Sequence, residues 1–177
     1  LTVNGKMFLA ASDVCLSLAA NTYCYYFNKD LVTDYGMEDP YTVVSEGRWT
    51  IDYVLQNVAS VYTDANGDGI TGNDDVYGFA TEKTNSLVPY FYAFEIDTVE
   101  LTKDGVNIVF DKVEKNIDAV EKLRTLLYGS QGSYAYTGEG AYKNGADLFV
   151  IQNAIFAVSK LGDSAGWFRE ACEFDYG

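Results

Sequence analysis

The segment from Asp64 to Asp75 has the residue types and spacing of a loop that binds a divalent cation. Oxygen-bearing side chains stand at positions one, three and five of the twelve, a glycine follows at position six, and an aspartate closes the loop. Ca²⁺ takes about six to eight oxygen ligands, and this spacing wraps them around one point. We predict a calcium loop over 64–75 with these ligands: Asp64, Asn66, Asp68, the carbonyl of Ile70, and Asp75.

The surroundings of this loop indicate a structural role for the metal. Position nine is Gly72, so a water must serve there, and the aspartate at position twelve has a shorter arm than the usual glutamate. One helical segment, 50–63, enters the loop, and a strand-like segment, 76–80, leaves it. We therefore expect the metal to hold the end of a helix to the start of a strand. We do not expect the loop to be part of a paired EF-hand sensor that opens when it binds calcium.

Charge and composition exclude several classes of function. The 177 residues include 26 acidic and 12 basic residues, for a net charge of −14. Binding to nucleic acid or to an anionic membrane needs a basic surface, so neither is expected as a partner. We find no run of the roughly 18 to 20 apolar residues that a membrane span requires.

The chain contains no histidine, which removes the commonest general base and every Ser-His or Cys-His pair. Three cysteines (Cys15, Cys24 and Cys172) are too few and too irregular for a disulfide framework or a zinc site. We expect buried, inert thiols, with a Cys15–Cys24 bridge left open. Acidic residues are plentiful, but no catalytic pair stands out beyond the loop. We therefore expect no enzyme activity.

Hydrophobic periodicity predicts alternating strands and helices, which favours one α/β domain over 1–177. Strands are expected at 3–11, with Asn4-Gly5 as a turn just inside it, and at 23–27, 76–80 and 147–151. A hairpin of 98–102 and 106–110 is expected around an Asp-Gly turn. Helices are expected at 28–35, 50–63, 87–95, 112–128, 139–144 and around 165–170, and a loop at 37–47. Leu1 follows no basic, apolar leader, and we expect the chain to be a segment of a longer protein.

Several motifs, in this order, resemble extracellular solute-binding proteins of ABC importers, the broad class of maltose-binding protein. They are Asn4-Gly5-Lys6, Tyr26-Phe27-Asn28-Lys29-Asp30-Leu31, Gly47-Arg48-Trp49-Thr50, the acidic loop with Asp75-Val76-Tyr77-Gly78-Phe79, and Tyr142-Lys143-Asn144-Gly145-Ala146. The resemblance covers nearly the whole chain. It implies one lobe, the second in chain order, of a two-lobed type II periplasmic-binding-protein fold with a mixed sheet flanked by helices.

The resemblance also implies a function and a location. It implies a non-catalytic lobe that binds a small-molecule solute, with sugar favoured, and that works with an ABC permease. The protein would be extracellular, lipid-anchored at the cell surface, or periplasmic. The ligand-facing residues it suggests are Asn21, Tyr90, Gln152 and Asn153.

Two alternatives remain open at this point. One is a fragment of a secreted carbohydrate-active enzyme that works with paired carboxylates. The other is a calcium-dependent, dockerin-like interaction module. A dockerin needs two such loops, and this sequence has one.

Overall fold

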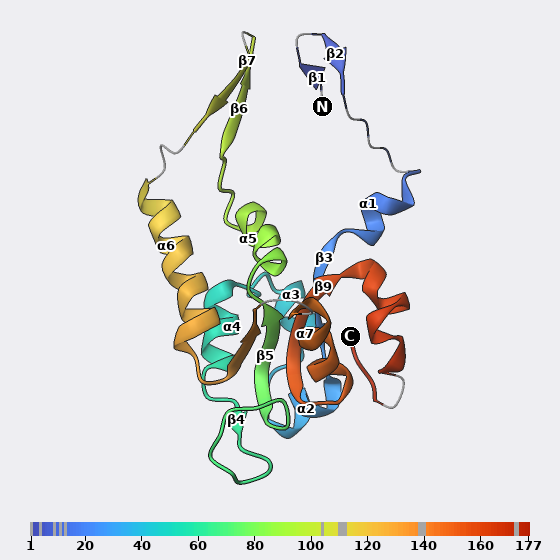
Figure 1. The fold of residues 1–177 in the computed structure, drawn as a ribbon, viewed down its shortest axis with the longest axis vertical. Coiled ribbons are helices and arrows are strands. Elements are labelled where there is room, and N and C mark those ends of the chain that lie inside the picture. Colours follow the sequence, from blue (N-terminus) through green and yellow to red (C-terminus); the bar gives the residue numbers. More distant parts are fainter. Residues whose placement is uncertain are drawn as a thin grey trace.

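A five-stranded mixed sheet forms the centre of the molecule (Figure 1). The computed structural model describes residues 2–3, 5–8, 10, 12, 14–103, 105–109, 113–137, 141–171 and 174–177. Four strands follow one another across the sheet in the order β3 (Tyr23–Phe27), β9 (Ala154–Lys160), β5 (Val76–Glu82) and β4 (Tyr62–Thr63). The fifth, β8 (Ser133–Tyr136), runs parallel to the second half of β5. β3 and β4 are antiparallel to their neighbours, and β5 is parallel to β9.

Helices cover both faces of this sheet. The described helices are α1 (Leu16–Ala20), which lies beyond one end of the sheet, and α2 (Lys29–Asp34), α3 (Pro40–Ser45), α4 (Ile51–Val58), α5 (Val88–Ala93), α6 (Val113–Arg124) and α7 (Ala141–Val150). A π-helical turn, η2 (Thr125–Gly129), extends α6, and short 3₁₀ helices occur at η1 (Asn85–Leu87), η3 (Leu161–Ala165) and η4 (Trp167–Glu170). The described helices include none that is long and apolar enough to cross a membrane.

Alternating side chains of β3 divide the core between the two faces, as the period-2 geometry of a strand requires. Phe27 packs into a cluster with Val54 and Val58 of α4, both at most 1% exposed. Tyr26 points into a second cluster with Phe149 of α7 and a phenylalanine of η4. The sheet is therefore the middle of three layers.

Three glycines let helices approach the sheet closely. A Cβ added at Gly132 would lie 1.7 Å from the Val58 carbonyl oxygen, and one at Gly78 would lie 2.8 Å from the Val58 Cα. A Cβ at Gly145 would lie 3.2 Å from the backbone of Thr81 in β5. The end of α4 and the middle of α7 thus contact neighbouring segments backbone to backbone, with no side chain between them.

Two hairpins extend from one end of this body (Figure 1). One pairs β6 (Val99–Thr102) with β7 (Gly105–Ile108), and it confirms the hairpin predicted from the Asp-Gly turn. The other pairs β1 (Thr2–Val3) with β2 (Lys6–Met7). The sequence predicts a strand over 3–11 with a turn at Asn4-Gly5, and the structure confirms the turn at Gly5, whose φ is +70°, whereas the strand that follows it is the short β2.

Local signals located several elements correctly. The strand predicted at 23–27 is β3, and the helix predicted at 28–35 is α2, where the Asn28 side chain accepts a hydrogen bond from the Leu31 amide. Thr50 caps α4 by accepting from the Tyr53 amide at 3.2 Å. That helix ends at Val58, so the predicted range 50–63 was too long, and its last residues form β4 instead.

Other predictions were wrong. The expected loop 37–47 contains α3, which begins at Pro40 after an Asp39 cap. The expected strand 147–151 belongs to α7, because Gly145 does not stop the helix but allows it to contact β5. The late strand is β9, a continuous apolar run buried on both faces. Several predicted features involve residues outside the described part of the chain: Asn4, Leu9, Ala11, Asp104, Asp111, Glu139 and Cys172.

Candidate functional site

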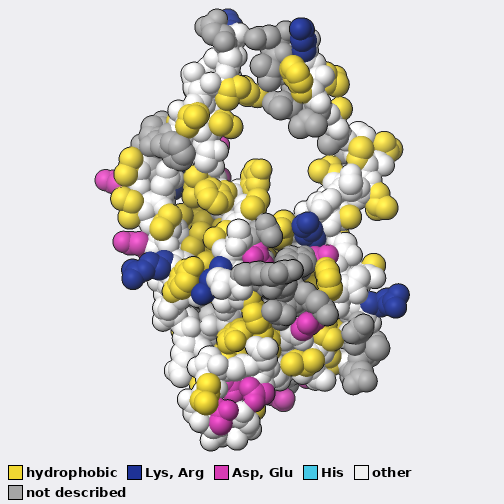
Figure 2. Space-filling view, in the orientation of Figure 1, with side chains coloured by type: hydrophobic (Ala, Val, Ile, Leu, Met, Phe, Trp, Pro, Cys, Tyr) yellow, Lys and Arg dark blue, Asp and Glu magenta, His cyan; other side chains and the backbone are white. Residues whose placement is uncertain are grey.

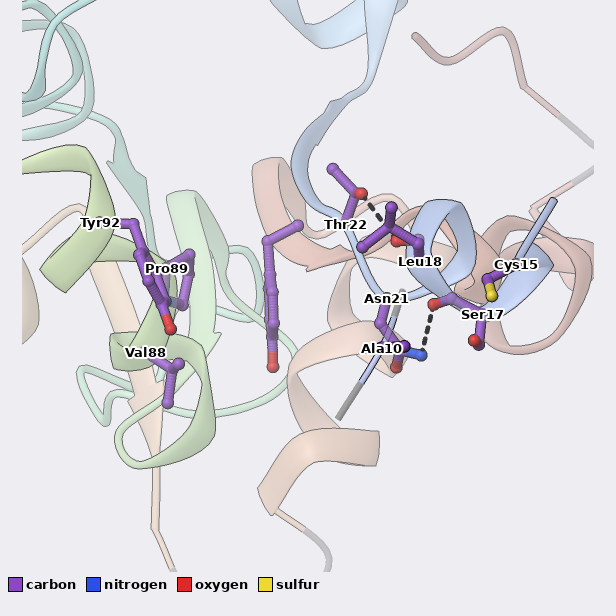
Figure 3. A pocket seen from close by; sticks show the side chains of 10 residues that line it. Ala10, Cys15, Ser17, Leu18, Asn21, Thr22, Val88, Pro89 and Tyr92 are labelled. Carbon is purple, nitrogen blue, oxygen red and sulfur yellow. Dashed lines mark hydrogen bonds between the residues drawn. The ribbon is translucent and has the colours of Figure 1, made fainter. Parts of the chain in front are cut away.

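A cavity of about 780 Å³ lies between α1 and α5, at the end of the sheet where Tyr23 of β3 pairs with Lys160 of β9 (Figure 3). α1 and the turn after it supply one wall, with Leu18, Asn21 and Thr22 among its residues. α5 supplies the facing wall, with Tyr92 pointing inward in Figure 3. The volume falls in the range of small-molecule sites, about 300–1,000 Å³.

None of the ten described residues that line this cavity carries a formal charge. They are Ala10, Cys15, Ser17, Leu18, Asn21, Thr22, Tyr23, Val88, Pro89 and Tyr92. Hydroxyls, one side-chain amide and two aromatic rings are the groups available to a ligand. Such a lining suits an uncharged ligand that makes hydrogen bonds and stacks on rings.

Local hydrogen bonds hold the polar side chains of the α1 wall. The Asn21 amide donates to the Ser17 carbonyl at 2.8 Å, and the Thr22 hydroxyl donates to the Leu18 carbonyl at 3.1 Å. Among the described residues, none donates a hydrogen bond to the side-chain oxygen of Asn21, which can therefore accept one from a ligand. Desolvation raises the pKa of Tyr23, and the negative charges of Glu82 and Asp163 raise it further. The Tyr23 hydroxyl therefore keeps its proton and can act as a hydrogen-bond donor.

Tyr90 and Tyr92 have different environments although they are two residues apart on α5. Tyr90 is 7% exposed, and its hydroxyl lies 2.6 Å from that of Tyr25 inside the core. Burial raises the pKa of Tyr25 to about 12, and it also raises the pKa of Tyr90 well above its ordinary value. Tyr92 is 81% exposed and lines the cavity. The structure therefore places Tyr92, rather than the predicted Tyr90, on this surface.

The other residues suggested as ligand-facing separate into two places. Asn21 lines the cavity, whereas Gln152 and Asn153 lie at the opposite end of β9. The sequence analysis expected those two to follow a strand, but they form the turn between α7 and β9, where Gln152 has a φ of +64°. The Asn153 side-chain amide donates to the Asn73 carbonyl at 2.9 Å, and this hydrogen bond links the turn to the acidic loop.

Two of the cysteines lie near the cavity, and the structure has both as free thiols. The Cys15 thiol lines the cavity, and hydrogen bonds from the backbone and side chain of Ser12 lower its pKa. Burial raises the pKa of Cys24 in β3. Neither thiol has a base beside it among the described residues that line the cavity.

The acidic loop 64–75 lies at the far end of the sheet, and Figure 2 shows acidic side chains gathered there. The Asp64 carboxylate accepts from the amides of Gly67 at 2.7 Å and Gly69 at 2.9 Å. The Asn66 amide donates to the carboxylates of Asp68 and Asp74. Side chains at positions three, five and eleven of the loop thus converge on one point.

Asp75 turns inward from the same loop and is fully buried. Its carboxylate accepts from the Gly72 amide at 2.9 Å, the Tyr62 hydroxyl at 3.1 Å and the Ala65 amide at 3.3 Å. These hydrogen bonds lower the pKa of Asp75, and the bond from the Gly72 amide has the largest effect. Among the described residues, no three acidic, histidine or cysteine side chains stand in a metal-holding arrangement.

Comparison with known proteins supports the fold but no family. No protein-family model matches the chain, and no curated protein matches its sequence. The structure is similar to the GacH receptor of Streptomyces glaucescens GLA.O, solved with and without acarbose, at a TM-score of 0.59 and 16% identity over 88% of this chain. It is also similar to UspC of M. tuberculosis, at a TM-score of 0.59 and 16% identity over 89% of this chain.

The chain spans 36% of the length of GacH and 40% of the length of UspC. At this identity the likeness concerns the fold alone, a mixed α/β sheet flanked by helices, as predicted from the sequence. Sequence reasoning missed Tyr92 and Thr22 as cavity residues. The available signal was the spacing of α5, on which Tyr92 lies one turn after Val88 and away from buried Tyr90.

Proposed function

We propose that this chain is one lobe of the solute-binding receptor of an ABC importer, and that its solute is a carbohydrate. The uncharged cavity between α1 and α5 carries this proposal, because its hydroxyls, amide and exposed tyrosine ring match a polar, neutral ligand. The fold shared with GacH, a receptor solved with acarbose, supports it. The lobe would bind without covalent chemistry, and closure against a second lobe would signal to the permease.

The experiment is a binding measurement on the two-lobed protein that carries this chain. A glycan array that runs from monosaccharides to hexasaccharides serves as the probe, followed by calorimetry on the best binder. We expect reversible binding without hydrolysis. Hydrolysis of the sugar would contradict a receptor that only binds its solute. Equally tight binding by residues 1–177 alone would contradict a site that needs the second lobe.

We also propose that the loop 64–75 holds a structural Ca²⁺, with Asp64, Asn66, Asp68, the Ile70 carbonyl and Asp75 as its ligands. The spacing of the oxygen-bearing side chains supports this proposal. The carboxylates of Asp68 and Asp74 also lie close together, since both accept from the Asn66 amide, and carboxylates are groups that a hard cation prefers. The metal would tie the end of β4 to the start of β5. Such a protein works outside the cytoplasm, where calcium is plentiful, and we propose a surface or periplasmic location.

Chelation tests the calcium proposal. Excess EGTA should lower the melting temperature, and added Ca²⁺ should restore it, because a ligand that binds only the folded state stabilises it. Asp68→Ala should abolish this calcium-dependent shift, whereas Asp34→Ala, an exposed acidic residue on α2, should keep it. An unchanged melting temperature on chelation of the unsubstituted protein would refute a structural metal.

A further inference from the structure

Another cavity, of about 370 Å³, lies between α4, α5 and α6, and we call it the interhelix cavity. Tyr90 and Phe94 line it from α5 and the residue that follows, whereas Val88 and Tyr92 of the same helix line the cavity assigned to the solute. Because a helix turns by about 100° per residue, these two pairs lie on opposite sides of α5. The two cavities share no described lining residue, so they are separate places in the fold.

Aromatic rings form much of the wall of the interhelix cavity. Trp49, which precedes α4, packs edge-on against Tyr25 of β3, with ring centroids 5.3 Å apart and ring planes at 78°. Phe94 supplies a third ring, and it is half-buried like Trp49. Aromatic rings attract a further ring in edge-to-face or offset stacked contact. The walls therefore favour a flat, aromatic ligand.

The innermost polar groups of this cavity are the bonded hydroxyls of Tyr25 and Tyr90. Only one hydrogen can lie between two oxygens that are 2.6 Å apart, so the second hydroxyl has a proton left to donate. Neither hydroxyl makes another hydrogen bond to the residues that the structure describes. A buried donor without an acceptor is costly. A ligand that brings an acceptor to this pair removes that cost.

Charged groups from two helices stand at the more exposed side of the interhelix cavity. The Lys122 ammonium of α6 lies 2.9 Å from the Asp52 carboxylate of α4 and 3.4 Å from that of Asp118. Lys122 and Asp52 both line the cavity. Two carboxylates beside one ammonium leave a net negative charge, which repels an anionic ligand. A carboxylate accepts a hydrogen bond from a hydroxyl group, so this side suits a neutral ligand that carries one.

We propose that the interhelix cavity is a second ligand site, separate from the cavity assigned to the solute, and that it takes a neutral phenol with a carbonyl group at the far end of its ring. The carbonyl oxygen accepts from the tyrosine pair, and the ring packs against Trp49 and Phe94. The phenol hydroxyl donates to Asp52. This inference goes beyond the proposed function and does not depend on it, because it uses none of the residues that line the solute cavity.

The test uses calorimetry on the intact protein that carries this chain, with 4-hydroxyacetophenone as the probe. The matched ligand is 4-ethylphenol, which keeps the ring and the hydroxyl but has no carbonyl oxygen. We expect the probe to bind at least about fivefold more tightly than 4-ethylphenol, the effect of one hydrogen bond. In the double variant Tyr25→Phe/Tyr90→Phe the two ligands should bind equally, because both rings remain and both hydroxyls are gone. Equal affinity of the two ligands for the unsubstituted protein would overturn the proposal.

A cavity-filling variant locates the site. Ala93→Phe puts a ring into the interhelix cavity and should abolish binding of both ligands. Phe91→Ala is the control on the same helix, since Phe91 is outside the described lining of this cavity, and it should change neither affinity. Melting curves confirm that each variant folds. Binding that survives Ala93→Phe, or binding of neither ligand by the unsubstituted protein, would also overturn the site.

Competition with sugar separates this site from the solute cavity. The probe is titrated again in the presence of a saturating amount of the best binder from the glycan array. We expect the probe still to bind, whereas competitive displacement by the sugar would place it in the solute cavity and overturn the second site. If no glycan binds at all, the proposed function fails, and the comparison of the two phenols still decides this inference.

Discussion

The two ends of the central sheet are built in opposite ways. At the loop end, twelve consecutive residues fold on themselves, and their carboxylates accept from amides a few positions away. At the cavity end, α1 and α5 supply the walls although some seventy residues of chain separate them. The first region is charged and internally hydrogen-bonded, and the second is uncharged and hollow. We therefore expect substitutions at the loop end to affect stability, and substitutions at the cavity end to affect the binding proposed above.

The strongest way to test this contrast is to disturb the packing near the loop. Gly132→Ala places a methyl group against the Val58 carbonyl oxygen, and neither backbone can move without shifting α4 from the sheet. We expect the free energy of unfolding to fall by at least about 3 kcal/mol, measured by urea denaturation. Gly129→Ala is the matched control, because its nearest atom is a flexible methyl at 3.7 Å, and should change stability by less than about 1 kcal/mol.

A smaller loss is expected on removing the inward-facing carboxylate. Asp75→Asn puts an NH₂ group where both oxygens accept hydrogen bonds, so buried donors lose their partner. We expect a melting temperature lower by about 4–8 °C at pH 7. Asp74→Asn, on the exposed side of the loop, should lower it by no more than about 2 °C. Equal effects of the two substitutions would contradict the larger structural role that burial gives to the Asp75 carboxylate.

Acidification gives an independent check on Asp75. The folded pKa of Asp75 lies below its ordinary value of 3.8, so the carboxylate stabilises the fold above that pH. This contribution is lost as the pH falls through the lowered folded pKa. The difference in melting temperature between the unsubstituted protein and Asp75→Asn should therefore be full at pH 5–7 and shrink below about pH 4. A difference in melting temperature that persists at pH 2 would mean that Asp75→Asn acts through altered packing and not through the loss of a negative charge.

The smallest effect on stability is expected from the anchor beneath the cavity. Tyr90→Phe removes one side of the 2.6 Å hydrogen bond to Tyr25 while it keeps the buried ring. We expect a loss of about 1 kcal/mol in unfolding free energy. Tyr25→Phe should cost a similar amount, and the double substitution little more, because both remove the same bond. Additive losses would show that the two hydroxyls act separately.

The sequence revealed the loop end far better than the cavity end, for a physical reason. Position-by-position spacing predicted a loop over 64–75, and the structure has one there between β4 and β5, with most of its hydrogen bonds formed within the loop. The calcium ion itself stays a prediction. β3 and α2 were located to within a residue or two because periodicity and the Asn28 cap are local signals as well. The cavity depends on how α1 and α5 are placed by the sheet, and no local pattern records that placement.

The wrong predictions have the same origin. Gly145 was interpreted as the end of a helix, but tertiary packing uses its missing side chain to bring α7 against Thr81. β9 escaped notice because a strand buried on both faces lacks the alternating pattern of a half-exposed one. Tyr90 and Tyr92 both belong to an aromatic run, and only the position of α5 in the fold separates the core residue from the cavity residue.

The pairing of β3 with β9 constrains the order of folding during synthesis. β3 leaves the ribosome early, yet its neighbour in the sheet is made on the order of 130 residues later, which at usual rates of translation takes about ten seconds. Throughout that interval Tyr25, Tyr26 and Phe27 belong to a nascent strand whose partner does not yet exist. The wall residues that follow α1 are fixed only when β9 arrives, so the cavity is among the last parts of this chain to form.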